Sequence, residues 1–199
     1  MKMHRVQDLG HLPPFEFGAR SAVFWGTLGF MLIEGTGFAL AIGAYLYLAL
    51  VNETWPLGAA PPGLVWSSAL TVLLLASVAP NIRTDRDARQ MNLRAVRFDL
   101  VVMSAIGVAA LGLRAIEFTT LNVRWDDNAY GSILWTILGL HTLHILTDLV
   151  DTLVLTALMF TKHAKGKRFA DVSDNALYWH FVVATWLPLY ALLYFAPRL

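Results

Sequence analysis

Residues 130–160, YGSILWTILGLHTLHILTDLVDTLVLTALMF, are the stretch that decides the fold. They include no lysine or arginine, and at about 1.5 Å per residue a helix of this length crosses a hydrocarbon layer about 30 Å thick. At about 100° per residue, the side chains of His141, His144, Asp148 and Asp151 fall within an arc of roughly 80°. An ionisable side chain that faces lipid near the bilayer centre costs about 2.5–3.5 kcal/mol. This face is therefore predicted to form a buried ionisable cluster that points into a helix bundle.

The composition favours a membrane protein over a soluble domain. Of 199 residues, 57% are hydrophobic and 15% are charged, whereas about a quarter of the residues of a typical soluble domain are charged. There is no cysteine, which excludes disulfides, thiolate-ligated metal centres and catalytic thiols. Residues 1–10 are polar and lack the layout of a secretory signal, so no cleaved signal is expected.

Five apolar stretches are predicted to be membrane-spanning helices, residues 22–51, 64–79, 98–118, 133–160 and 176–195. The second is expected to end before Pro80, because proline cannot continue the hydrogen-bond ladder. None of the stretches alternates apolar and polar residues as a strand of a membrane β-barrel does. The chain is thus predicted to be one integral-membrane domain, residues 1–199, with an all-α fold of five transmembrane helices.

The basic residues of the loops predict an orientation. Twelve lie on one side of the five-span arrangement, and two, Arg124 and Arg198, lie on the other. The twelve are Lys2, Arg5, Arg20, Arg83, Arg86, Arg89, Arg94, Arg97, Lys162, Lys165, Lys167 and Arg168. Because short cytoplasmic loops are rich in lysine and arginine, the N-terminus is predicted to be cytoplasmic and the C-terminus extracytoplasmic.

The first span carries a carboxylate at depth. Glu34 lies about 18 Å from the start of the helix, where it is expected to be protonated or paired. It could form a structural hydrogen bond to a neighbouring helix, with His141 as the expected partner, or it could handle protons. Gly35, Ala39 and Gly43 recur every four residues and predict a face that another backbone can approach closely.

Two further groups of polar and aromatic residues belong to the third and last spans. Arg114 and Glu117 are three residues apart near the outer end of the third span, a spacing that suits an ion pair on one helix. Tyr178, Trp179 and His180 are expected near the cytoplasmic membrane interface, where amphipathic rings are favourable. Pro188 is expected to kink the last span.

A metal site is one interpretation of the ionisable cluster. His141 and His144, with Glu34 or Asp148, could in principle hold a metal. A di-metal carboxylate bundle, however, needs Glu-x-x-His pairs from two helices, and the sequence has none. A bis-histidine haem beside a haem–copper centre would need more intramembrane histidines than this chain has. We therefore expect no haem or transition metal bound by this chain.

Three segments resemble subunit III of the haem–copper oxidases, the cytochrome c and quinol oxidase family, in its five-helix bacterial form. The first is FWGTLGFMLIEGTGF, which contains Glu34, and the third is YWHFVVATW, which contains Tyr178, Trp179, His180, Phe181 and Trp186. The second is LRAIEF followed by DNAYGSILWTILGLHTLH, which contains Glu117, Tyr130, Gly131, Ser132, Gly139, His141 and His144. Two positions depart from the family pattern: Val183 replaces an aspartate, and Asp148 replaces a glycine.

The resemblance implies an accessory subunit of a respiratory oxidase in the bacterial inner membrane. Such a subunit has no redox cofactor, packs against the catalytic haem–copper subunit I, binds structural phospholipid and supports proton uptake during oxygen reduction. Tyr178, Trp179, His180 and Trp186 would be the family-motif residues of its last helix.

Other functions stay open from the sequence. A relative of subunit III that serves a nitric oxide reductase is compatible with the same motifs. A small proton-coupled transporter could use Glu34, His141, His144 and Asp148 as a relay, although the sequence shows no internal repeat typical of transporters. A membrane metalloenzyme is a third alternative.

Overall fold

The computed structural model describes residues 15–162 and 164–198, and all regular elements in this part of the chain are helical. Five long helices follow one another: α1 (Ala22–Val51), α2 (Leu64–Arg89), α3 (Leu93–Thr119), α4 (Ala129–Met159) and α5 (Gly166–Tyr190). Each is long and apolar enough to cross a membrane. The predicted all-α fold with five membrane-spanning helices is therefore confirmed. Lys2 and Arg5, which contributed to the predicted orientation, lie outside the described residues.

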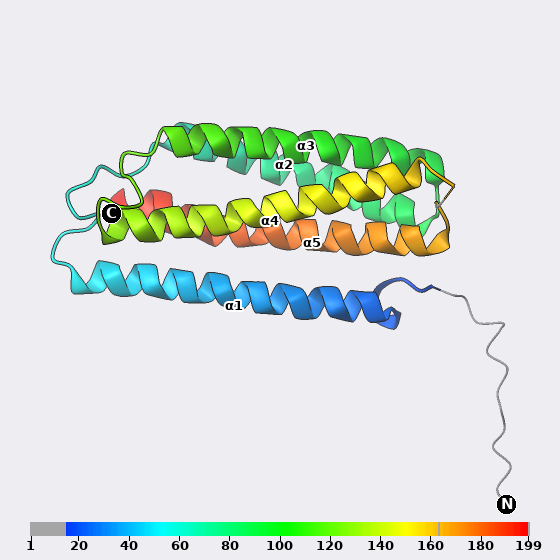
Figure 1. Cartoon of the computed structure of the whole chain (residues 1–199), viewed down its shortest axis with the longest axis horizontal. Helices are drawn as coiled ribbons and strands as arrows, with labels where there is room; N and C mark the ends of the chain where they lie inside the picture. Colours follow the sequence, from blue (N-terminus) through cyan, green and yellow to red (C-terminus); the bar gives the residue numbers. More distant parts are fainter. Residues whose placement is uncertain (1–14, 163, 199) are drawn as a thin grey trace, which may run out of the picture.

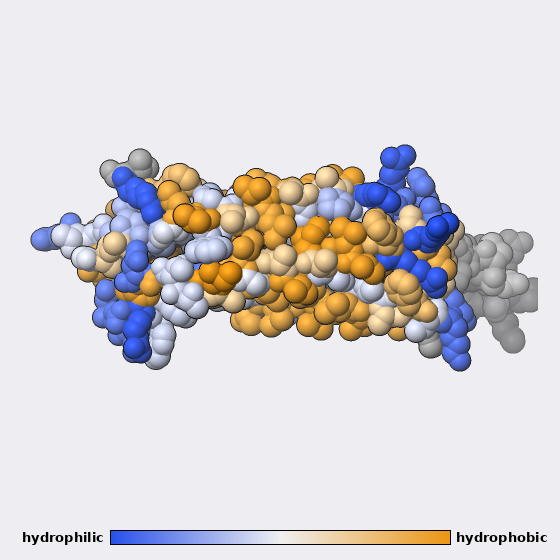
Figure 2. Space-filling view, turned by 90° about the horizontal axis from the view of Figure 1, so that it is seen from above, coloured by the Kyte–Doolittle hydropathy of each residue, from blue (hydrophilic) through white to orange (hydrophobic). Residues whose placement is uncertain are grey.

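Four of the helices form the main bundle and α1 lies along one side of it (Figure 1). α2 packs against α3 and α5, and α4 packs against α3 and α5, whereas the main contacts of α1 are with α4 and α5. Leu70, Leu134, Val182 and Leu189 are fully buried in the core of this bundle. The apolar surface forms a belt between two hydrophilic ends, as Figure 2 shows, which is the surface a bilayer requires.

Four helices extend beyond the apolar stretches that identified them. α2 continues through Pro80 to Arg89, so the predicted stop at Pro80 was wrong. The proline removes one ladder bond, but α2 is held by neighbours there: the Asn81 amide donates to the carbonyl of Ala176 in α5 at 2.7 Å. α3, α4 and α5 likewise begin at Leu93, Ala129 and Gly166, earlier than predicted. Hydropathy marks the part of a helix inside hydrocarbon, and polar ends lie outside that part.

The last helix changes its winding after its internal proline. The α-helical part of α5 includes Pro188 and ends at Tyr190. A π-helical turn, η2 (Ala191–Phe195), and a 3₁₀ turn, η3 (Ala196–Arg198), complete the described chain. Because π turns form where the ordinary ladder is interrupted, this change is consistent with the bond that Pro188 cannot donate.

The glycine face expected on α1 does not bring a second backbone close in this chain. A Cβ atom at Gly35 would lie 3.7 Å from the Phe181 ring, which is ordinary contact, and at Gly43 it would meet nothing within 4 Å. A close approach occurs instead at Gly131 near the start of α4, where a Cβ atom would lie 2.1 Å from the carbonyl oxygen of Arg124. Gly131 is thus required for the loop before α4 to fold over the helix end.

Candidate functional site

Glu34 in α1 contacts α4 and α5 through both carboxyl oxygens. Its Oε1 lies 3.2 Å from Nε2 of His144, and its Oε2 accepts a hydrogen bond from the Tyr178 hydroxyl at 2.8 Å. The Glu34 side chain is 16% exposed and that of His144 is 7% exposed. The expected pairing of Glu34 with His141 was therefore wrong. His141 and His144 share a face of α4, and helical periodicity could not decide which of them α1 would meet.

The hydrogen bonds around His144 define how the pair can hold a proton. Nδ1 of His144 lies 2.5 Å from the carbonyl oxygen of Leu140, an acceptor only, so Nδ1 is the protonated nitrogen. Nε2 is at ion-pair distance from Glu34 without hydrogen-bond geometry to any described residue. One proton can thus reside either on the carboxyl of Glu34 or on Nε2 of His144, and the pair is neutral overall in both cases.

His141 belongs to a separate buried network. Its Nε2 lies 3.0 Å from the carbonyl oxygen of Val182 and so donates to it. Its Nδ1 then accepts from Nη2 of Arg114 at 3.1 Å. Arg114 also donates to Oε2 of Glu117 at 2.7 Å and lies over the Trp186 ring, 4.2 Å from its centroid. The ion pair expected from the spacing of Arg114 and Glu117 is present.

This network is more deeply buried than the sequence suggested. Arg114 is 0% exposed and Glu117 is 2% exposed, so the pair is enclosed by neighbouring helices near the end of α3. The second carboxyl oxygen of Glu117 accepts from the Tyr194 hydroxyl. The network joins α3 to α4, α5 and η2. Because a buried charge needs a partner, each member depends on the others.

Asp148 and Asp151 form a third group, nearer the other end of α4. The Asn175 amide donates to Oδ1 of Asp148 at 3.3 Å and to Oδ2 of Asp151 at 3.1 Å. The Thr152 hydroxyl donates to Oδ2 of Asp148 at 3.5 Å. Asp148 is 3% exposed, but Asp151 is exposed, so the prediction that Asp151 is buried was wrong. The predicted cluster is thus divided into three groups along the helix.

The family-motif residues of α5 point into the bundle. The indole of Trp179 donates to the Ser77 hydroxyl at 2.8 Å, and that of Trp186 donates to the Thr71 hydroxyl at 2.7 Å. Nδ1 of His180 lies 2.8 Å from the Asn81 amide. Tyr178 and Trp179 are 8% and 2% exposed, so both rings are buried between the helices. Their expected place near the cytoplasmic membrane interface stays a prediction.

Two residues of these networks were not singled out from the sequence. Asp174 precedes the predicted last span, residues 176–195, but it lies two turns inside α5 and is 6% exposed. Tyr194 lies in a run of aromatic and leucine residues in which its hydroxyl gave no distinguishing signal. Asp171 and Asp174 are three residues apart and follow three basic residues. This helical spacing could have indicated that the last helix begins before residue 176.

No group of three or more histidine, cysteine, aspartate or glutamate side chains within residues 15–162 and 164–198 is placed to hold a metal ion. In His141 both ring nitrogens have partners in the chain. In His144 one nitrogen bonds Leu140 and the other faces Glu34. Ligation of a metal by either ring would break these contacts.

Comparison with known proteins identifies the family. Residues 22–197, which contain all five long helices, match the family described as cytochrome c oxidase subunit III. The cytochrome c oxidase subunit 3 of Thermostichus vulcanus is 26% identical over 176 residues, which cover 87% of each chain. That of Pyricularia grisea is 25% identical over 177 residues, 85% of this chain and 66% of that protein. That of Drosophila melanogaster is 25% identical over 181 residues, 85% of this chain and 68% of that protein.

The chain thus spans most of the length of the T. vulcanus protein and about two thirds of the other two. These matches agree with the resemblance carried by the Glu34, His141–His144 and Tyr178–Trp186 segments. The chain belongs to the cytochrome c oxidase subunit III family.

Proposed function

We propose that this protein is an accessory subunit of a terminal haem–copper oxidase and binds no redox cofactor itself. The observation that carries the proposal is the family match over residues 22–197. It is supported by the two intramembrane histidines of α4, whose rings serve contacts within the chain. Haem and copper would be held by partner subunits. The chain would stabilise the catalytic subunit during electron transfer to oxygen.

The proposed location is the bacterial inner membrane, with the N-terminus in the cytoplasm. The start of α1, the α2–α3 turn and the α4–α5 loop lie at the same end of the bundle (Figure 1). The described lysines and arginines that predicted the orientation lie at this end. Arg124 and Arg198 are the two exceptions, and they lie at the opposite end. By the rule that cytoplasmic loops are rich in lysine and arginine, this end is assigned to the cytoplasm. Residues 1–199 would then form one membrane domain.

We also propose roles in lipid binding and proton uptake. α1 exposes large apolar side chains along most of its length: Trp25, Phe30, Leu32, Ile33, Leu40, Tyr47 and Leu50. Because α1 packs on α4 and α5 only along one side, phospholipid or a partner subunit must cover the rest. The Glu34–His144 pair, which can carry its proton on either residue, is the group proposed to support proton uptake.

Gentle purification of the chain from native membranes tests the proposal. The expected result is co-purification with haem-bearing subunits that oxidise a reduced cytochrome c or a quinol with oxygen. Nitric oxide reduction by the same complex would instead favour the reductase-associated alternative. A chain that purifies alone, and that transports a solute with protons after reconstitution, would refute the accessory-subunit proposal.

A further inference from the structure

A cavity of about 450 Å³ lies between α1 and the α4–α5 pair, in the half of the bundle nearer the basic end. Three aspartates line it, Asp148 and Asp151 from α4 and Asp174 from α5, and we call it the acidic cavity. Its remaining walls are mostly apolar and aromatic: Val23, Gly26, Thr27, Phe30, Thr147, Asn175 and Tyr178. Apolar walls around carboxylates form a site for a cation that is carried on a hydrocarbon stem.

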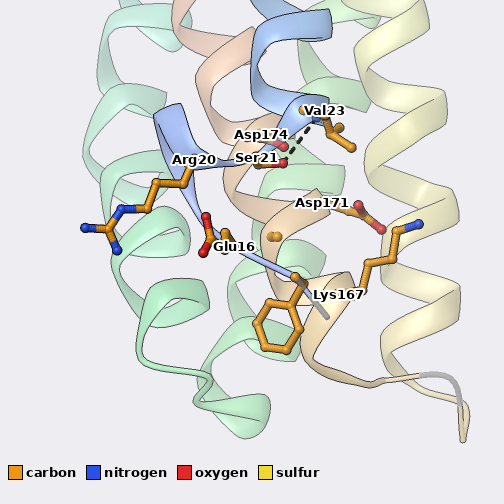
Figure 3. A pocket seen from close by; sticks show the side chains of 10 residues that line it. Glu16, Arg20, Ser21, Val23, Lys167, Asp171 and Asp174 are labelled. Atoms are coloured by element: carbon orange, nitrogen blue, oxygen red, sulfur yellow. Dashed lines mark hydrogen bonds between the residues drawn. The ribbon is translucent and has the colours of Figure 1, made fainter. Parts of the chain in front are cut away.

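Asp174 supplies an unsatisfied carboxylate oxygen. The residue is 6% exposed, and its Oδ2 has no hydrogen-bond partner among the described residues. Asp174 also borders a smaller cavity beside Arg20, Ser21 and Lys167, where Figure 3 shows it close to the start of α1. A buried carboxylate without a partner is costly. It is therefore expected to have a partner in the functional assembly.

The described part of the chain pairs no cation with the three aspartates of the acidic cavity. Within residues 15–162 and 164–198, no ion pair joins a lysine, arginine or histidine to Asp148, Asp151 or Asp174. Arg168, near the start of α5, is engaged by Asp171 at 2.7 Å. The Asn175 amide donates to Asp148 and Asp151, and the Thr152 hydroxyl donates to Asp148, whereas Oδ2 of Asp174 has no partner among the described residues. The described part of the chain thus leaves these carboxylates open to a cation from a neighbouring subunit.

The depth of the cavity favours a protein side chain over a lipid headgroup. Asp148 lies inside the apolar stretch 133–160, eleven residues or about 16 Å along the axis from the end of α4, whereas Asp174 lies just before the apolar stretch that begins at residue 176. Headgroups lie at the surface, whereas a lysine or arginine on a neighbouring membrane helix can reach this depth laterally. A Cβ atom at Gly26 would meet nothing within 4 Å, so a neighbouring helix can come close at the wall of the cavity.

We infer that the acidic cavity receives a lysine or arginine side chain from a membrane helix of a neighbouring oxidase subunit. This inference rests on the proposed function, because it requires a complex. Intramembrane charges pair with one another, and a cation between Asp148 and Asp174 satisfies the free oxygen of Asp174.

The test compares Asp148→Asn and Asp174→Asn with Asp126→Asn in the purified complex. Asp126 is an exposed residue of the opposite loop that pairs only with Arg124. The fraction of the chain that remains bound is measured over a detergent dilution series. The cavity variants are expected to raise the dissociation constant of the chain by about tenfold or more, and the control by less than about twofold. Melting of the isolated variants identifies any that fail to fold.

A photoreactive residue in place of Thr27, on the α1 wall, identifies the occupant without changing any aspartate. The expected product joins this chain to a membrane helix of another subunit, with a lysine or arginine within one turn of the crosslink. Replacing that basic residue of the partner subunit by methionine should lower the fraction of this chain that stays bound to the complex. In a complex that already carries Asp148→Asn, the same replacement should cause no additional loss. Crosslinks to phospholipid alone, or to a helix without a basic residue, would overturn the inference.

The two proposals fail in different ways. Equal retention of all three variants in an active oxidase complex would refute the cation contact and leave the accessory function standing. Failure of the native chain to co-purify with haem-bearing subunits would refute the accessory function and, with it, this inference.

Discussion

Replacement of Arg114 by methionine should destabilise the bundle more than any surface change. Methionine keeps much of the side-chain volume but removes the cation from Glu117 and the donor from Nδ1 of His141. Arg114 and Glu117 are at most 2% exposed, and removing one member of a buried ion pair costs about 3–5 kcal/mol. The lost contact with the Trp186 ring accounts for about 0.5–2 kcal/mol of this cost.

A double-mutant cycle separates the charge from the packing. Arg114→Met leaves Glu117 charged and buried, with only Tyr194 as a partner. In Arg114→Met/Glu117→Gln no uncompensated charge remains, because glutamine is neutral and can still accept from Tyr194. The double variant is therefore expected to cost less than the sum of the two single variants by about 2 kcal/mol or more.

The free energy of unfolding of the isolated chain in mixed micelles, followed by tryptophan fluorescence, measures these differences. Arg124→Met is the matched control, since Arg124 pairs with Asp126 at the surface and its side chain is 73% exposed. That control is expected to cost less than about 1 kcal/mol. A loss for Arg114→Met no greater than for the control, or additive effects in the cycle, would refute the reasoning.

Three further predictions follow from the fold and the site. Single cysteines at Arg86 and Asp126, in a chain without native cysteine, are expected to react with an impermeant maleimide from opposite faces of the membrane; reaction from one face would contradict the topology. Metal analysis of the isolated chain is expected to find no stoichiometric iron or copper, and one equivalent retained after chelation would contradict this. Glu34→Ala is expected to lower the unfolding free energy by about 1–3 kcal/mol and to weaken oxidase assembly, because His144 and Tyr178 lose their partner. Glu34→Gln is expected to lower the unfolding free energy less, since an amide can donate to His144 and accept from Tyr178. Equal losses for the alanine and glutamine variants would contradict these contacts.

The fold could be predicted from the sequence because it depends mainly on the hydropathy of long stretches of the chain. The number of spanning helices follows from long apolar runs, such as residues 130–160, which contain no lysine or arginine, and the bilayer requires that they be helical. The helix ends could not be predicted equally well. α2 runs ten residues beyond the predicted stop, to Arg89, because its polar end is held by both neighbours: Arg83 pairs with Asp99 of α3, and Asp85 accepts from Ser173 of α5.

The composition of the candidate site could be predicted, but its pairing could not. Periodicity placed His141 and His144 on one face of α4, and it identified Arg114 and Glu117 as neighbours on α3. Which histidine meets Glu34 depends on how far α1 is shifted along α4, a property of three-dimensional packing that no single helix encodes. Asp174 was missed for a related reason: its depth depends on where α5 begins, and that lies in a polar segment.

The position of α1 against only α4 and α5 also has a consequence for biosynthesis. Glu34 and its donor Tyr178 are 144 positions apart in the sequence. At roughly 5–20 residues per second, α1 leaves the ribosome about 7–30 seconds before Tyr178 is made, and His144 is made only shortly earlier. Until His144 is made, the carboxyl of Glu34 has no native partner in the nascent chain. Membrane insertion must therefore deliver α1 with this carboxyl protonated or shielded by the insertion machinery, and its native contacts form only after α4 and α5 have been synthesised.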